Sequence, residues 1–304
     1  MLNNFKLKYY FLSIAFFLTI LHPLYSQIPD FSKVPFLQKG DSLNITYLIQ
    51  NGVKISNGKV ISWFPKDSLT EKRMNEITAM LNTGISGAEK FINAPFSWQV
   101  QKPTEAYTFY FRFDRFISHA SNAGFISIPF WRIKEGKAPW LHEVMHEMLN
   151  TKTGSWSDSG ITEKEWLEKM PLWLFEGLPD YISLKVSLIE KLTWFDVFSN
   201  SYQTNIDSLF TREIMGDKGS YILSFIGTKG VMSELFSENR ILYAPAFYHG
   251  SHSFVKYLAN NYKLPILLTA ISAFRQETET LERLTGKLLD TLKKEWLNEL
   301  KIWK

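Results

Sequence analysis

Residues 141–150 read LHEVMHEMLN, and within them His142, Glu143 and His146 form the pattern H-E-x-x-H. Helical side chains four positions apart lie on one face, because a turn takes about 3.6 residues. Both imidazoles can therefore reach one zinc ion at about 2.0–2.1 Å, with Glu143 beside the open coordination position. The stretch predicts a helix that carries half of a zinc site and a base for water activation.

A catalytic zinc ion takes three protein ligands and keeps one position for water, so a further ligand must come from elsewhere. Residues 171–183 read PLWLFEGLPDYIS, an apolar run of helical character that contains Glu176. Gly177 beside it permits close approach of another backbone. Asp180 lies four residues after Glu176 on the same helix face. It suits the carboxylate that receives the second N–H of a ligating histidine, here His142.

The two segments together resemble the gluzincin clan of zinc metallopeptidases, which contains thermolysin and the M1 aminopeptidases. More narrowly, they are similar to the small peptidase-MA-like domains. The resemblance is carried by H-E-x-x-H followed by W-x-x-E-G-x-x-x-Y, and it implies one zinc ion held by His142, His146 and Glu176. It further implies Glu143 as general base and Asp180 as the carboxylate behind the ligands. The alternative is a chance match on an amphipathic helix with a buried histidine.

The N-terminus predicts export. Residues 1–26 begin with Lys6 and Lys8, continue with the apolar run YYFLSIAFFLTIL, and read as a signal peptide cleaved between Ser26 and Gln27. An uncleaved anchor helix is the alternative, although the apolar run is short for a membrane span. Without cysteine, the chain has no disulfides, thiolate ligands or lipid-anchoring cysteine. We expect a secreted or periplasmic protein with no stable membrane insertion after cleavage.

Composition bounds the remaining possibilities. Of 304 residues, about 278 remain after cleavage, enough for one large domain or two packed subdomains. The net charge of +4 falls to +2 when the two leader lysines are removed, which argues against a nucleic-acid partner. Aromatic residues reach 15%, and a large helical core explains them more simply than a sugar-stacking platform.

The pattern of residues predicts an α+β fold, with a small mixed β-sheet packed on the H-E-x-x-H helix and a mostly helical C-terminal lobe. Turns at Asn51-Gly52 and Asn57-Gly58 would divide the strand-like run 42–64, and Ser68 or Thr70 would cap a helix ending near Phe91. Further strands are expected at 106–113 and 124–133, and the H-E-x-x-H helix at about 138–151. The expected later helices are 163–170, 172–190, 208–214, 219–235, 245–262, 264–275, 277–285 and 288–301.

These elements suggest three parts of the chain. We expect a signal peptide at 1–26, an N-terminal strand or hairpin extension at 27–58, and a metallopeptidase-like domain at 59–304. Within the last part, the sheet would extend to about residue 152 and the helical lobe would begin at about 153.

The resemblance also suggests substrate-binding residues. In the clan, the edge strand of the sheet borders the cleft, and here Gly124, Phe125 and Ile126 take the corresponding place. An exposed edge can pair with an extended peptide, whereas an internal strand cannot, and the sequence is compatible with both. The strand GFISIPFW lacks the acidic residue with which M1 aminopeptidases bind a free amine, which weakens an aminopeptidase interpretation.

A tyrosine on a later helix completes the expected site. YHGSHSFVKYLANNY at 248–262 is similar to the tyrosine-bearing helix of M1 and peptidase-MA-like proteins, which implies Tyr248 as oxyanion donor. The Lys-Gly pair that follows this tyrosine in M1 enzymes is replaced by His249-Gly250, so a core tyrosine remains the alternative. His249 and His252 are the other candidate donors, and His119 is expected to be incidental.

The sequence thus favours an exported zinc metallopeptidase that acts on a peptide or protein substrate, with Glu143 as general base for a zinc-activated water. One alternative is a catalytically silent module that binds peptide or glycan in its cleft. The other is a metal-free structural domain.

Overall fold

The computed structural model describes residues 38–92, 106–113, 118–120, 125–149, 171–192, 205–215, 219–228, 243–273 and 280–301. The predicted signal peptide, the helix expected at 163–170 and Gly124 lie outside these residues. None of the described helices combines the length and the apolar character that crossing a membrane requires.

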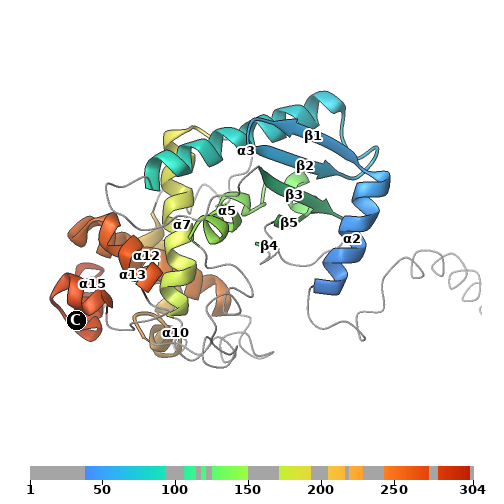
Figure 1. Ribbon diagram of the computed structural model, residues 1–304. Helices are drawn as coiled ribbons and strands as arrows, with labels where there is room; N and C mark the ends of the chain where they lie inside the picture. The colour runs from blue at the N-terminus through green and yellow to red at the C-terminus, as the bar shows by residue number, and fades with distance from the viewer. Residues whose placement is uncertain are drawn as a thin grey trace, which may run out of the picture.

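A five-stranded mixed sheet lies in the N-terminal half of the fold, with strand order β1-β2-β3-β5-β4 (Figure 1). β1 and β2 form an antiparallel hairpin at the predicted Asn57-Gly58 turn, where Gly58 takes a φ of 53°. β2, β3 and β5 run parallel, and β4 pairs with β5 antiparallel. The strands are β1 (Val53–Asn57), β2 (Val60–Phe64), β3 (Tyr107–Arg112), β4 (His119–Ala120) and β5 (Phe125–Pro129).

Helices α3 (Glu71–Ile92) and α5 (Trp140–Met148) cover the sheet. The Thr70 hydroxyl accepts a hydrogen bond from the Arg73 N–H at 3.3 Å, so α3 begins at one of the two predicted caps. Trp140 at the start of α5 is buried, and its ring meets Phe109 of β3 edge to face at 6.5 Å. The H-E-x-x-H helix is thereby fixed against the strands.

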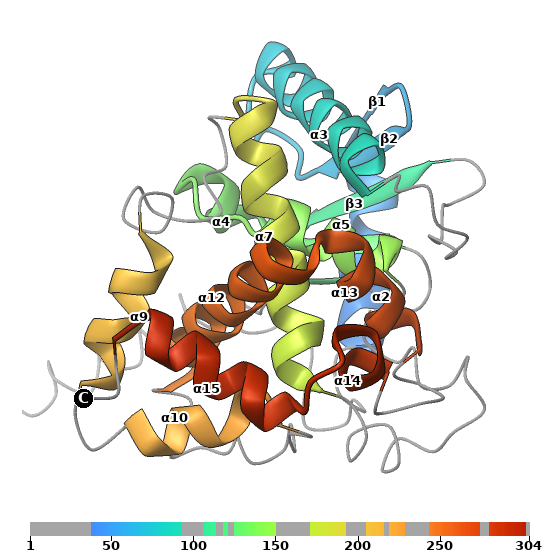
Figure 2. The same ribbon diagram turned by 90° about the vertical axis from the view of Figure 1, so that its left-hand side faces the viewer.

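The C-terminal half is a helical lobe built around α7 (Leu172–Ile189). Helices α12 (Ala244–Tyr262) and α13 (Leu264–Ala273) pack on α7, and α15 (Leu289–Glu299) packs on α12 (Figure 2). Phe254 of α12 packs on Trp173 of α7 at 4.8 Å and on Trp296 of α15 at 4.9 Å between ring centroids. These aromatic residues form core, as the simpler interpretation of the composition predicted. The other described helices of this lobe are α9 (Ile206–Ile214), α10 (Gly219–Phe225) and α14 (Thr280–Thr285).

The predicted fold class is confirmed: a small mixed sheet packs on the H-E-x-x-H helix, and a mostly helical lobe follows. Among the described later helices, α10 differs from its prediction. It ends at Phe225 rather than near residue 235, because a turn follows in which Gly227 takes a φ of 67°.

The N-terminal extension differs more strongly from the strand or hairpin that the sequence predicted. The residues before Gly52 form helix α2 (Gln38–Asn51), not a strand, and the Gly52 N–H donates to the Leu48 carbonyl at 2.7 Å. Asn51-Gly52 therefore ends a helix instead of turning a hairpin. Strands β1 and β2 lie on either side of the expected boundary between residues 58 and 59, and they pair along the full length of β1.

The strand predicted at 124–133 is wrong in its second half. β5 ends at Pro129, and helix α4 (Phe130–Lys134) follows, with Pro129 as its N-cap residue. Proline lacks an N–H for a strand ladder but is well tolerated at the start of a helix. This correction places Arg132 on a helix that lies between β5 and α5 in the chain.

Candidate metal centre

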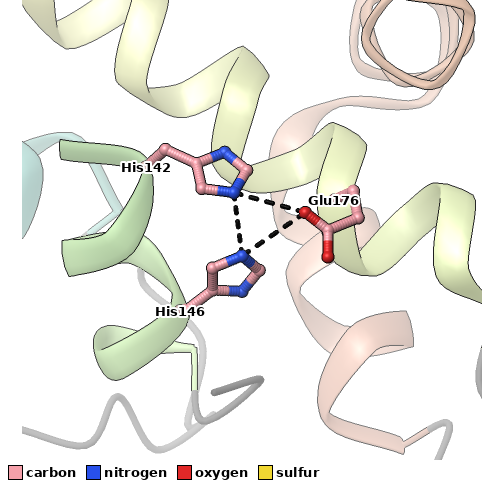
Figure 3. A group of neighbouring side chains, drawn as sticks. All are labelled: His142, His146 and Glu176. Atoms are coloured by element: carbon pink, nitrogen blue, oxygen red, sulfur yellow. Dashed lines mark hydrogen bonds and ion pairs between the residues drawn. The ribbon is translucent and has the colours of Figure 1, made fainter. Parts of the chain in front are cut away.

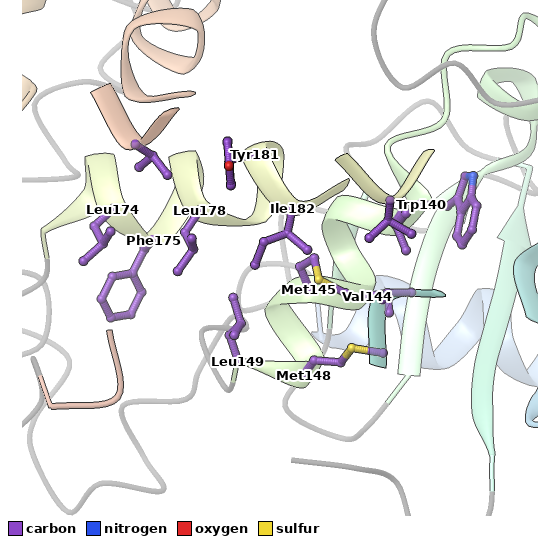
Figure 4. Close-up of a cluster of buried hydrophobic side chains, with 14 of the residues drawn as sticks. Trp140, Val144, Met145, Met148, Leu149, Leu174, Phe175, Leu178, Tyr181 and Ile182 are labelled. Carbon is purple, nitrogen blue, oxygen red and sulfur yellow. The ribbon is translucent and has the colours of Figure 1, made fainter. Parts of the chain in front are cut away.

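The site is carried by two helices that pack directly on each other, α5 and α7. Figure 4 shows their apolar side chains meeting, with Met145 of α5 beside Ile182 of α7. Both of these side chains are buried. Gly177 has the close neighbour that the sequence predicted: a Cβ there would lie 2.5 Å from the Ser251 carbonyl oxygen of α12. The position of α7 between α5 and α12 is therefore closely fixed.

His142, His146 and Glu176 converge on one point between α5 and α7 (Figure 3). The Glu176 Oε2 atom lies 3.3 Å from His142 Nε2 and 3.5 Å from His146 Nε2. The two Nε2 atoms are 2.9 Å apart. All three side chains are about nine-tenths buried. The expected ligand residues are thus brought together by the fold.

Their separations fit a zinc ion. Two ligands of a tetrahedral zinc ion at about 2.0–2.1 Å lie about 3.3 Å from each other. Both histidine–glutamate distances agree with that value, and only the distance between the imidazoles is somewhat shorter. Two imidazole nitrogens and one carboxylate are also the donor set of many catalytic zinc sites. Geometry and chemistry together make this group suitable for one zinc ion.

Asp180 lies where the sequence placed it, behind His142. Its Oδ1 atom is 2.6 Å from His142 Nδ1, and the carboxylate is buried. Burial alone lowers the pKa of His142, but the charge and the hydrogen bond of Asp180 outweigh it and raise this pKa well above its usual value. The bond leaves Nε2 of His142 directed at the convergence point (Figure 3). A cation bound there would compete with a proton for that nitrogen.

Glu176 is held in its ionised form. Burial alone raises the pKa of this carboxyl, but the adjacent His146 and His142 outweigh burial and hold the pKa well below its usual range. An ionised carboxylate is the form that coordinates a metal ion.

Glu143 and Tyr248 lie within electrostatic reach of the same group. Glu143 is buried on the first turn of α5. Tyr248 of α12 is half-buried, and burial, reinforced by Glu176, Asp180 and Glu143, raises the pKa of its phenol well above the usual value. The phenol therefore keeps its proton and remains a hydrogen-bond donor.

The two alternative donors have other environments. His249 Nδ1 lies 2.7 Å from Glu213 Oε2 of α9. His252 is buried in the core, where its ring meets Tyr181 edge to face. Burial, followed by the charge of Lys256, lowers the pKa of His252 to about 3, so this histidine is neutral. Of the three candidates, Tyr248 has the surroundings that suit an oxyanion donor.

The predicted substrate strand is not an edge. β5 lies between β3 and β4, and Ile126 pairs with Ala120 of β4. Ile126 is also buried, whereas Phe125 is half-buried against Tyr110. The interpretation of these residues as an exposed peptide-binding edge is therefore wrong for Ile126, because β4 occupies its free side.

Sequence reasoning missed one residue near the site. Arg132 of α4 is half-buried, and Glu143 and Tyr248 both influence its guanidinium. We expected this residue to lie in a strand, although Pro129 signalled the end of β5.

Comparisons of this chain with family models, with curated proteins and with solved structures find no match. The functional interpretation therefore rests on the side chains of the site.

Proposed function

We propose that this protein is an exported zinc metallopeptidase of the gluzincin type that hydrolyses peptide bonds. The observation that carries the proposal is the convergence of His142, His146 and Glu176, whose ligand atoms all lie within 4.8 Å of one another. Glu143 on the same helix as the histidines supports a hydrolytic role, since a site that only holds an ion needs no general base.

The chain's own residues would share the work as follows. His142, His146 and Glu176 would hold the ion, and Asp180 fixes the tautomer of His142. Bound zinc would supply a Lewis acid that lowers the pKa of water and polarises a carbonyl. Glu143 accepts the proton of the attacking water and passes it to the leaving amine. Tyr248 donates a hydrogen bond to the oxyanion, a contribution of about 10²–10³ in rate.

The predicted signal peptide supports export, and the net charge supports a peptide rather than a nucleic-acid substrate. Purified mature protein should contain one zinc ion per chain by elemental analysis. It should cleave a mixture of denatured proteins, and a chelator should abolish the cleavage. Protein with zinc but no cleavage would favour the silent binding module, and protein without zinc affinity would favour the structural domain.

The general base is tested by Glu143→Gln, which keeps the shape of the side chain but removes its basicity. The variant should bind zinc like the parent and lose nearly all turnover. Glu135→Gln is the matched control, because Glu135 is exposed and pairs with Lys137 among the described residues. Equal turnover of Glu143→Gln and parent would contradict the proposed mechanism.

A further inference from the structure

Two arginines lie where the parallel strands β3 and β5 end. Arg112 is the last residue of β3, and its Cα partner on β5 is Pro129. Arg132 follows on α4, three residues after Pro129. Parallel strands finish at the same edge of a sheet, so Arg112 and the turn that leads to Arg132 lie at one edge, and α5 packs on β4 and β5 of the same sheet. Arg112 is buried in the fold, whereas Arg132 is half-buried.

The contacts of Arg132 leave much of its guanidinium unused. Nη1 donates to the Ser118 hydroxyl at 3.3 Å, and the group lies 5.5 Å from the centroid of the Trp131 ring. Nε is buried and has no acceptor among the described residues. Among the residues that the structure describes, no carboxylate forms an ion pair with Arg132. A guanidinium in these surroundings retains donors for a ligand.

Arg132 lies next to the helix that carries the proposed general base, because Ser118, which it contacts, directly precedes β4, and α5 packs on β4 and β5. Burial lowers the pKa of the Arg132 guanidinium, whereas the charges of Glu143 and Tyr248 raise it. A ligand held by Arg132 would therefore lie beside α5, and the charges of Glu143 and Tyr248 that act on the guanidinium agree with that position. The planar fork of N–H donors in arginine matches a carboxylate, with which it forms paired charge-assisted hydrogen bonds.

We propose that Arg132 binds a carboxylate of the peptide substrate beside the scissile bond and so directs cleavage to peptides that carry a negative charge there. This inference rests on the proposed peptidase function and adds the class of substrate. The carboxylate comes from a free C-terminus or from an acidic side chain, which present the same chemistry to a guanidinium.

Matched peptides distinguish the two sources. One pair differs only in a free or amidated C-terminus, and the other only in Asp or Asn next to the scissile bond. The parent should prefer one charged member by about 10- to 100-fold in kcat/KM, the range expected for a charge-assisted bond. Arg132→Gln should abolish that preference through KM, and Arg132→Lys should restore part of it. Lys134→Gln is the matched control, since it removes an exposed positive charge from the same helix.

Binding separates this inference from the proposed function. Peptide affinity is measured by fluorescence anisotropy in the Glu143→Gln background, with and without Arg132→Gln. A preference for the charged peptide that depends on Arg132 would support the inference even if no peptide were cleaved. Equal affinity of the Glu143→Gln protein, with Arg132 intact, for charged and neutral peptides would overturn it, and this comparison needs no arginine variant to fold. If Arg132→Gln weakened the affinity for charged and neutral peptides equally, the inference would be overturned too, because Arg132 would then only position Glu143.

Discussion

Replacement of Asp180 tests most directly whether the carboxylate behind His142 strengthens metal binding. The carboxylate lies 2.6 Å from His142 Nδ1 and is buried, so water cannot replace it. In Asp180→Asn the amide oxygen can still accept from Nδ1–H, and only the charge is lost. In Asp180→Ala the acceptor disappears and a buried N–H is left without a partner.

The magnitude follows from the kind of bond. A hydrogen bond to a charged group contributes about 1.5–3 kcal/mol, and loss of the carboxylate behind a ligating histidine weakens metal binding by about 10- to 100-fold. We expect Asp180→Asn to weaken zinc binding by about 10-fold and Asp180→Ala by about 100-fold. Zinc affinity is measured by competition with a chromophoric chelator at neutral pH.

Another histidine–carboxylate pair of the chain provides a matched control. His249 Nδ1 and Glu213 Oε2 are 2.7 Å apart, and neither residue belongs to the metal-binding group. Glu213→Gln should therefore leave zinc affinity unchanged. Parent-like affinity of Asp180→Ala, or equal weakening by Glu213→Gln, would refute the assigned role of Asp180.

Three further predictions concern stability and pH. Gly177→Ala should lower the free energy of unfolding by about 1–3 kcal/mol in urea titrations, because the new Cβ would meet the Ser251 carbonyl oxygen at 2.5 Å; parent-like stability would show that α7 and α12 can separate freely. Trp296→Ala should lower the free energy of unfolding by about 3–5 kcal/mol, since the buried ring of Trp296 packs on Phe254. In the same urea titrations, a loss below about 1 kcal/mol would contradict that packing. Zinc affinity should fall as the pH falls through the raised pKa of His142, by about tenfold per pH unit for each proton displaced. Zinc titrations over a pH series check the sign, and tighter binding in acid would contradict it.

The sequence predicted the parts of the fold in which periodicity and local signals agree. Thr70 and the apolar spacing of residues 71–92 located α3, and Asn57-Gly58 located the hairpin. Helix α2 was missed because its residues favour strands and expose apolar side chains such as Leu43 and Tyr47, which leaves no clear helical stripe. Packing of the surrounding chain outweighs such propensity.

The candidate site was more predictable than the sheet edge. Ligand spacing on a helix follows from helical geometry, so His142, His146 and the pair Glu176 and Asp180 could be assigned to two faces before their distances were known. Arg132 could not be found in this way. Its relation to Glu143 arises from the turn of the chain at Pro129 and from strand pairing between distant segments, neither of which has a fixed spacing in sequence.

The central place of α7 has a consequence for how the protein matures. This helix contacts α5, which precedes it in the chain, and α12, which begins only at Ala244. During synthesis, His142, His146 and Glu176 therefore leave the ribosome well before α12, the helix that packs on α7 and carries Tyr248. On the proposed function, the ligand residues are therefore present early in synthesis, whereas the proposed oxyanion donor is added only with α12.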